Sequence, residues 1–255
     1  MTLNADLPSW CRLVRADNPS PMTLEGTNTY LLRVRGGTVV VDPGPLLDEH
    51  LERVADLAGT VVLTLLTHGH PDHAEGSGRF REITGAPVSA WDPRLCAHAP
   101  ALGRDDAPVD VAGLDLRVLH TPGHTGDSVC FVVADPAEPA VLTGDTVLGR
   151  GTTVVAHPDG ALAPYLASLH RLVDLGGMRL LPGHGPVRDD AAAVAQDYLN
   201  HRMMRLEEVR SALAGGARTP REVVEVVYAA VDPALWDAAE QSVRAQLDYL
   251  RDRSG

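Results

Sequence analysis

The feature that most constrains this chain is a dense group of metal-binding side chains directly after an apolar segment. Residues 61–66, VVLTLL, are typical of a buried strand, and His68-Gly69-His70-Pro71-Asp72-His73 follows at once. Burying so many ionisable groups is costly unless they bind a cation, and imidazole and carboxylate are common zinc ligands. The segment therefore predicts a metal site at the end of a strand.

The spacing within this segment favours two neighbouring metals. Residues two apart on an extended chain point the same way, which places His68 and His70 together. Asp72 and His73 begin a predicted helix and turn toward a second point. Each metal then needs further ligands from elsewhere in the chain.

Three later segments offer those ligands. Each follows a predicted strand and lies in a glycine-rich turn, where an α/β fold gathers functional groups at one edge of its sheet. They are TPGHTGDS with His124, VLTGDT with Asp145, and LLPGHGP with His184.

The rest of the pattern predicts a layered α/β domain followed by a helical region. Strands are expected at 11–16, 28–35, 38–42, 61–66, 116–120, 129–134 and 140–144, and helices at roughly 46–58, 72–84, 163–175 and 189–214. From about Asn200 we expect three helices, broken at Gly215-Gly216 and Asp232-Pro233. We therefore divide the chain into a catalytic domain, 1–199, and a C-terminal region, 200–255, which is also a candidate homodimer surface.

The order H-x-H-x-D-H, PGHT, TGD and PGHG resembles the metallo-β-lactamase superfamily, across roughly residues 10 to 200. The resemblance implies an αββα sandwich of two mixed β-sheets. It also implies that His68, His70 and His124 hold one metal, that Asp72, His73 and His184 hold the other, and that Asp145 bridges them. Asp72 and Asp145 are the expected catalytic residues.

A finer resemblance is to the beta-lactamase-like protein 2 family, a glyoxalase-II-like branch that includes endoribonucleases. It covers NPSPMTLEGTNTYLL at 18–32, LGRGTTVV at 148–155, LPGHGPV at 181–187 and His201-Arg202. It implies that residues 200–255 are a reduced winged-helix-like element.

The expected cofactors are two Zn²⁺ ions, with Mn²⁺ or Fe²⁺ as alternatives for a mixed nitrogen and oxygen site. Two such metals can share a hydroxide, lower its pKa toward about 7, and stabilise the oxyanion that forms on attack. Three further residues are weaker candidates. Asp42 is expected to orient a ligating histidine or to cap a turn, Thr125 to anchor a ligand loop, and His157 to contact substrate.

The sequence leaves the scissile bond open. A small ester or acyl-thioester substrate needs only a pocket beside the metals, whereas single-stranded RNA needs arginines and stacking rings. Arg33, Arg150, Arg202 and Arg205 could serve RNA, but the net charge is −12 and the chain has no lysine. A redox module or an inactive scaffold is the non-enzymatic alternative, and the seven filled ligand positions favour a hydrolase.

The N-terminus has acidic residues and no long apolar run, and no stretch of about 18 apolar residues occurs later. We therefore expect a cytoplasmic protein with no membrane partner.

Overall fold

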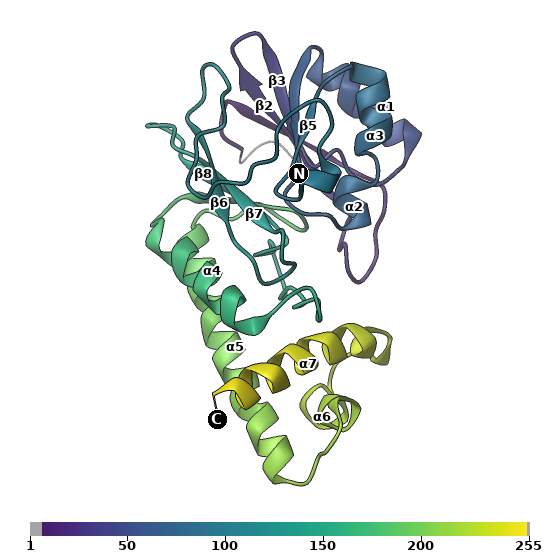
Figure 1. Cartoon of the computed structure of the whole chain (residues 1–255), viewed down its shortest axis with the longest axis vertical. Coiled ribbons are helices and arrows are strands. Elements are labelled where there is room, and N and C mark those ends of the chain that lie inside the picture. The colour runs from purple at the N-terminus through teal and green to yellow at the C-terminus, as the bar shows by residue number, and fades with distance from the viewer. Residues whose placement is uncertain (1–6, 254–255) are drawn as a thin grey trace.

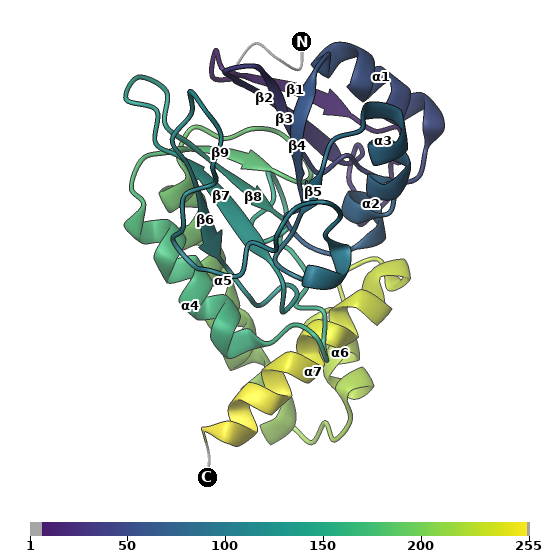
Figure 2. The same cartoon turned by 45° about the horizontal axis from the view of Figure 1, so that its top comes forward.

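The computed structural model describes residues 7–253, which form two facing β-sheets with helices on both outer sides (Figure 1). The first sheet has the strand order β1-β2-β3-β4-β5 and the second β6-β7-β8-β9. Figure 2 shows the two sheets between the helices α1 to α3 on one side and α4 and α5 on the other. The expected αββα sandwich is confirmed.

The first sheet is mixed. Its strands β1 to β3 pair antiparallel, and β3, β4 and β5 pair parallel. The strands are β1 (Cys11–Arg15), β2 (Asn28–Val34), β3 (Gly37–Val41), β4 (Val61–Leu65) and β5 (Val88–Ser89), and the covering helices are α1 (Asp48–Ala58), α2 (Pro71–Ala74) and α3 (Ser77–Thr84).

The second sheet is also mixed, since β6, β7 and β8 pair antiparallel while β8 and β9 pair parallel. Its strands are β6 (Leu116–His120), β7 (Val129–Val133), β8 (Ala140–Gly144) and β9 (Arg179–Pro182). Helices α4 (Leu162–Asp174) and α5 (Ala191–Ala214) lie on its outer face, and a short 3-10 helix, η1 (Pro93–Leu95), follows β5.

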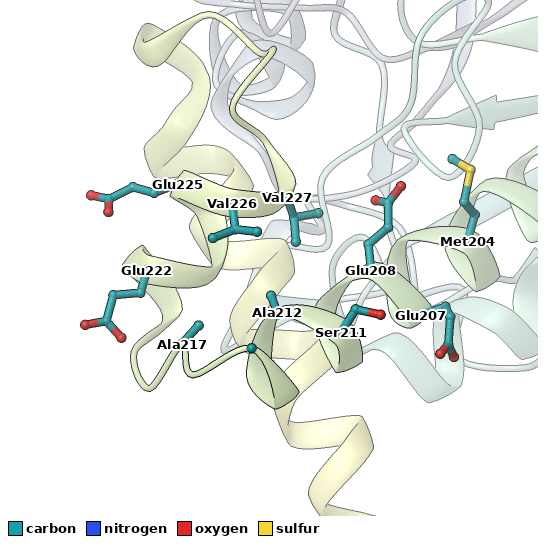
Figure 3. Close-up of a pocket in the computed structure, with 11 residues that line it drawn as sticks. Met204, Glu207, Glu208, Ser211, Ala212, Ala217, Glu222, Glu225, Val226 and Val227 are labelled. Atoms are coloured by element: carbon teal, nitrogen blue, oxygen red, sulfur yellow. The ribbon is translucent and has the colours of Figure 1, made fainter.

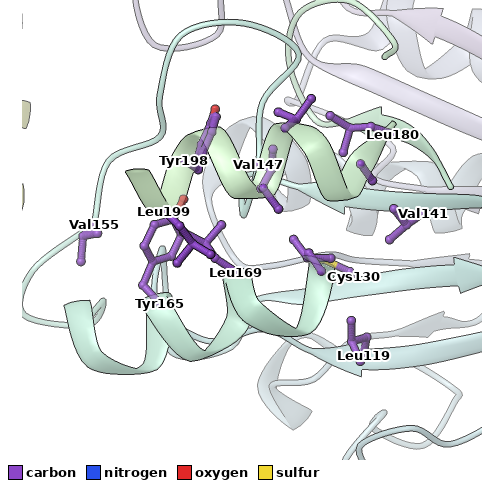
Figure 4. Packing of buried hydrophobic residues seen from close by; sticks show 14 of the residues in the cluster. Leu119, Cys130, Val141, Val147, Val155, Tyr165, Leu169, Leu180, Tyr198 and Leu199 are labelled. Carbon is purple, nitrogen blue, oxygen red and sulfur yellow. The ribbon is translucent and has the colours of Figure 1, made fainter. Parts of the chain in front are cut away.

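Alternating side chains build the layers, because neighbouring residues of a strand face opposite sides. In β2, Leu32 packs between the sheets, while Leu31 packs outward with Val54 of α1 and Phe80 of α3. The outer face of the second sheet packs in the same way against α4 and α5, through Leu119, Cys130, Val141, Tyr165, Leu169, Tyr198 and Leu199 (Figure 4).

The C-terminal helices are α6 (Pro220–Val227) and α7 (Trp236–Asp252), with the 3-10 helix η2 (Pro233–Leu235) between them. A capping box between Thr219 and Glu222 begins α6. Their own core joins Val209 of α5 to Val223 and Val243. The three helices and both breaks agree with the sequence pattern. The expected division after residue 199 falls inside α5, and it stays a prediction.

Two details differ from the sequence pattern. The expected helix 72–84 is two helices, and at Gly76 between them a Cβ would lie 2.8 Å from the carbonyl oxygen of Gly44, in the loop after β3. Strand β5 was not expected, since a run of two residues is too short for a periodic pattern, whereas β9 is the strand expected before the turn with His184. Among residues 7–253, no helix is both long and apolar enough to cross a membrane.

Candidate metal centre

The structure brings all seven expected ligands together at one edge of the sandwich. Five of them lie in the loops that follow β4, β6, β8 and β9, and Asp72 and His73 lie in α2. They form two groups, and within each group the ligand atoms lie within 4.8 Å of one another. The first group is His68, His70, His124 and Asp145, and the second is Asp72, His73 and His184.

In the first group, three imidazole nitrogens converge. Nδ1 of His70 lies 3.1 Å from Nε2 of His68 and 3.0 Å from Nε2 of His124. The opposite nitrogen of His124 donates to the Val154 carbonyl oxygen at 2.6 Å, which leaves the Nε2 lone pair free. Such outer hydrogen bonds are typical of metal-binding histidines.

The second group has the same design. Nε2 of His184 lies 3.2 Å from Nε2 of His73 and 3.0 Å from Oδ2 of Asp72. Nδ1 of His73 lies 2.8 Å from Oδ2 of Asp42, and Nδ1 of His184 lies 3.3 Å from the Gly26 carbonyl oxygen.

Asp145 lies between the groups. Its Oδ1 is 3.4 Å from Nε2 of both His73 and His184, and its Oδ2 is 3.8 Å from Nε2 of His124. Oδ1 is buried, and no hydrogen bond of proper geometry satisfies it. A buried carboxylate oxygen without a hydrogen bond is destabilising unless a cation binds to it.

The electrostatics agree with a cation site. Burial lowers the pKa of His68 well below its usual range and lowers that of His124 to about 4, so both rings are neutral at pH 7. Burial opposes ionisation of Asp72, yet His73 and His184 lower its pKa to about 2. In the second group burial opposes protonation, yet the nearby carboxylates raise the pKa of His73 well above its usual range and that of His184 to about 9. Divalent metals bind neutral imidazoles and ionised carboxylates, so a cation bound there would displace these two protons.

The spacing also fits. Tetrahedral ligands at zinc distances lie roughly 3.3 Å apart, close to the 3.0 to 3.2 Å between the facing nitrogens. The residues present therefore fit two divalent cations.

Of the three weaker candidates, Asp42 and Thr125 lie at the cluster and His157 does not. Asp42 contacts His73, as the first of its two expected roles required. Thr125 donates to Oδ1 of Asp127 at 2.7 Å and so holds the turn that carries His124. The structure does not bring His157 to the cluster: its Nε2 lies 2.9 Å from Oδ2 of Asp248 in α7, so the ring joins the loop to the tail.

A pocket of about 310 Å³ opens beside the cluster and is lined in part by His124 and Asp145. Its wall combines segments far apart in the chain. They are the loops with Leu24, Leu148, Thr153 and Val154, the α5 residues His201, Arg202 and Arg205, and the tail residues Tyr228, Val231, Leu235, Ala238 and Ser242. The tail residues were not expected as site residues, because no local pattern marks them. Leu24, residues 148–155 and His201-Arg202 lie in the stretches of the finer resemblance, and of the four arginines considered for RNA only Arg33 does not line the pocket.

Figure 3 shows a different hollow, of about 1020 Å³, between α5 and α6, where Met204 and Val226 lie among acidic side chains. None of the seven clustered residues lines it.

Comparisons with known proteins bear on both parts of the chain. Residues 22–184 match the model of the metallo-beta-lactamase superfamily, and residues 219–253 match that of the beta-lactamase associated winged helix domain. The winged-helix-like tail is thereby confirmed.

Similar proteins span most of the chain. A beta-lactamase-like protein 2 homolog of Drosophila melanogaster is 33% identical over 91% of this chain and 85% of its own. An atrochrysone carboxyl ACP thioesterase of Aspergillus chevalieri is 34% identical over 86% of this chain and 74% of its own. A solved metallo-beta-lactamase family protein of Thermus thermophilus has a TM-score of 0.81 at 26% identity, covering 96% of this chain and 94% of that one. The chain therefore belongs to the metallo-beta-lactamase superfamily of metal-dependent hydrolases.

Proposed function

We propose that this protein is a dinuclear zinc hydrolase that cleaves acyl thioesters or closely related esters. The support is the cluster of seven ligands together with an apolar pocket that opens directly onto it. The name of the Aspergillus relative, an ACP thioesterase, favours the same bond.

The pocket wall is the observation that carries the substrate class. The wall includes the apolar residues Leu24, Leu148, Val154, Leu235 and Ala238. An acyl chain bound against them would bury its apolar surface away from water, which favours binding. A thioester carbonyl at the inner end would lie beside His124 and Asp145.

The charges of the pocket favour a thioester over RNA. Arg150 is paired with Glu25, and Arg205 lies 2.8 Å from Glu208, so glutamates of the same chain already neutralise both cations. A ribonuclease groove needs several free cations along a phosphate backbone.

Two bound cations would lower the pKa of water and stabilise negative charge on the carbonyl oxygen. The chain's own residues supply orientation. Thr27 donates from Oγ1 to Oδ2 of Asp72 at 3.3 Å, and Asp72 lines the open side of the cluster. An ionised Asp72 placed there orients the attacking water and accepts its proton.

The test compares two substrate classes on one preparation. Zinc-loaded protein is given N-acetylcysteamine thioesters of increasing acyl length and, separately, a labelled single-stranded RNA. We expect thioester hydrolysis by the wild type, none by Asp72→Ala, and full activity in the exposed-helix control Asp56→Ala. RNA cleavage that Asp72→Ala abolishes, without thioester turnover, would replace the thioesterase by an endoribonuclease.

A further inference from the structure

The pocket contains a buried cation without a carboxylate partner. Arg202 of α5 is 3% exposed, and none of the ion pairs among residues 7–253 includes it. Its Nη2 donates to the Thr153 carbonyl oxygen, and its Cζ lies 5.1 Å from the centre of the Tyr165 ring. Its Nε is buried and has no hydrogen-bond partner. A buried charge in this state costs stability unless a counter-ion joins it.

The neighbouring side chain adds a second unused donor. Nε2 of His201 accepts from Nε of Arg205 at 3.3 Å, so a neutral His201 ring carries its proton on Nδ1. Burial, followed by the charges of Arg202 and Arg205, lowers the pKa of His201 to about 4, and the ring is neutral at pH 7. Its Nδ1 is buried and has no partner either.

Both unsatisfied atoms are donors, and both residues line the pocket. What they lack is an acceptor, and a negatively charged acceptor would also neutralise Arg202. The other two arginines of the pocket have Glu25 and Glu208, so the unpaired charge is that of Arg202.

The position relative to the metal cluster is fixed through one residue. Arg202 bonds to the carbonyl group of Thr153, and Oγ1 of the same threonine lies 3.2 Å from Nδ1 of His124. An anion held at Arg202 would therefore lie in the same pocket as the scissile bond.

We infer that His201 and Arg202 form an anion subsite that binds one charged group of the substrate, a carboxylate or a phosphate. This inference rests on the proposed thioesterase function and narrows it. The substrate then carries a negatively charged group, either on the acyl chain or on the thiol carrier.

The kinetic test uses matched thioesters. Glutaryl and pentanoyl N-acetylcysteamine differ by a carboxylate on the acyl group, and the pentanoyl thioesters of phosphopantetheine and pantetheine differ by a phosphate on the carrier. We expect wild-type kcat/KM to favour one charged member by about 10- to 100-fold, mainly through KM. Arg202→Gln should abolish the preference, while Arg202→Lys should keep part of it. Equal rates on both pairs, or a preference that survives in Arg202→Gln, would overturn the subsite.

A second measurement separates this inference from the proposed function. Sulfate is titrated into zinc-loaded wild type, Arg202→Gln, and the surface control Arg117→Gln, and the Tm is followed. Sulfate should raise the Tm of wild type and control more than that of Arg202→Gln, because the metals are common to all three. That result without thioester turnover would keep the anion subsite and discard the thioesterase. Equal rises in all three proteins would discard the subsite, and His201→Ala gives the same comparison should Arg202→Gln not fold.

Discussion

Asp42 and His73 are joined by a 2.8 Å contact between Oδ2 and Nδ1, and Thr67 links the same carboxylate to His68 of the other metal group. Its two oxygens accept from the backbone amide and the hydroxyl of Thr67, each at 2.7 Å, and that hydroxyl lies 3.0 Å from Nδ1 of His68. One buried carboxylate thus orients a histidine in each group.

We therefore expect Asp42→Asn to weaken binding of both metals. The amide cannot accept from both Thr67 and His73 as the carboxylate does, and loss of such an outer partner typically costs about 10- to 100-fold in affinity. Competition with a chelator, followed by metal analysis, measures the change. Asp56→Asn, on the exposed face of α1, is the matched control, and an unaltered chelator midpoint in Asp42→Asn would contradict the role.

Asp145→Ala removes the side chain between the groups. We expect turnover to be abolished and metal content to fall from two toward one per chain, because both groups lose a ligand. The fold should persist, since Asp145 lies in a loop after β8, and circular dichroism checks this. An active variant with two metals would refute the bridging assignment.

His50 predicts a specific acid sensitivity. Burial and then Arg53 lower its pKa to about 4, and its Nε2 lies 3.1 Å from Oγ1 of Thr29. Between about pH 6.5 and 4 the unfolded chain binds a proton at this residue that the folded chain does not. The free energy of unfolding should therefore fall as the pH drops through this window. Denaturant titrations at pH 7 and pH 5 measure the free energy of unfolding, and its decrease between the two pH values should be smaller in His50→Gln than in the wild type. An equal decrease in both proteins would rule His50 out as a contributor.

Ala238 of α7 lies on the wall shared by the pocket and the open side of the cluster. Ala238→Phe should fill acyl space and raise KM for long acyl chains several-fold, while acetyl thioester turnover and metal content stay unchanged. Kinetics across acyl lengths test this, with Ala234→Phe on exposed η2 as the control. A uniform loss of activity at every length would argue against an acyl-binding wall.

The sequence predicted the metal ligands well because each ligand sits in a local motif, a strand followed by a Gly or Pro turn. His124 and His184 needed no knowledge of tertiary structure to be recognised. The pocket wall could not be predicted in this way, since Thr153 and Ala238 line one pocket only after the tail has packed beside the cluster. His157 shows the same limit: it lies three residues from Val154 along the chain, yet Asp248 of α7 binds its ring.

The order of these parts along the chain has a consequence for synthesis. The seven clustered residues lie between positions 68 and 184, whereas α5, α6 and α7 follow them. Because a nascent chain folds from its N-terminus as it leaves the ribosome, the metals can be captured before the pocket wall is complete. We expect the ability to hold metal to appear earlier in translation than the ability to choose a substrate.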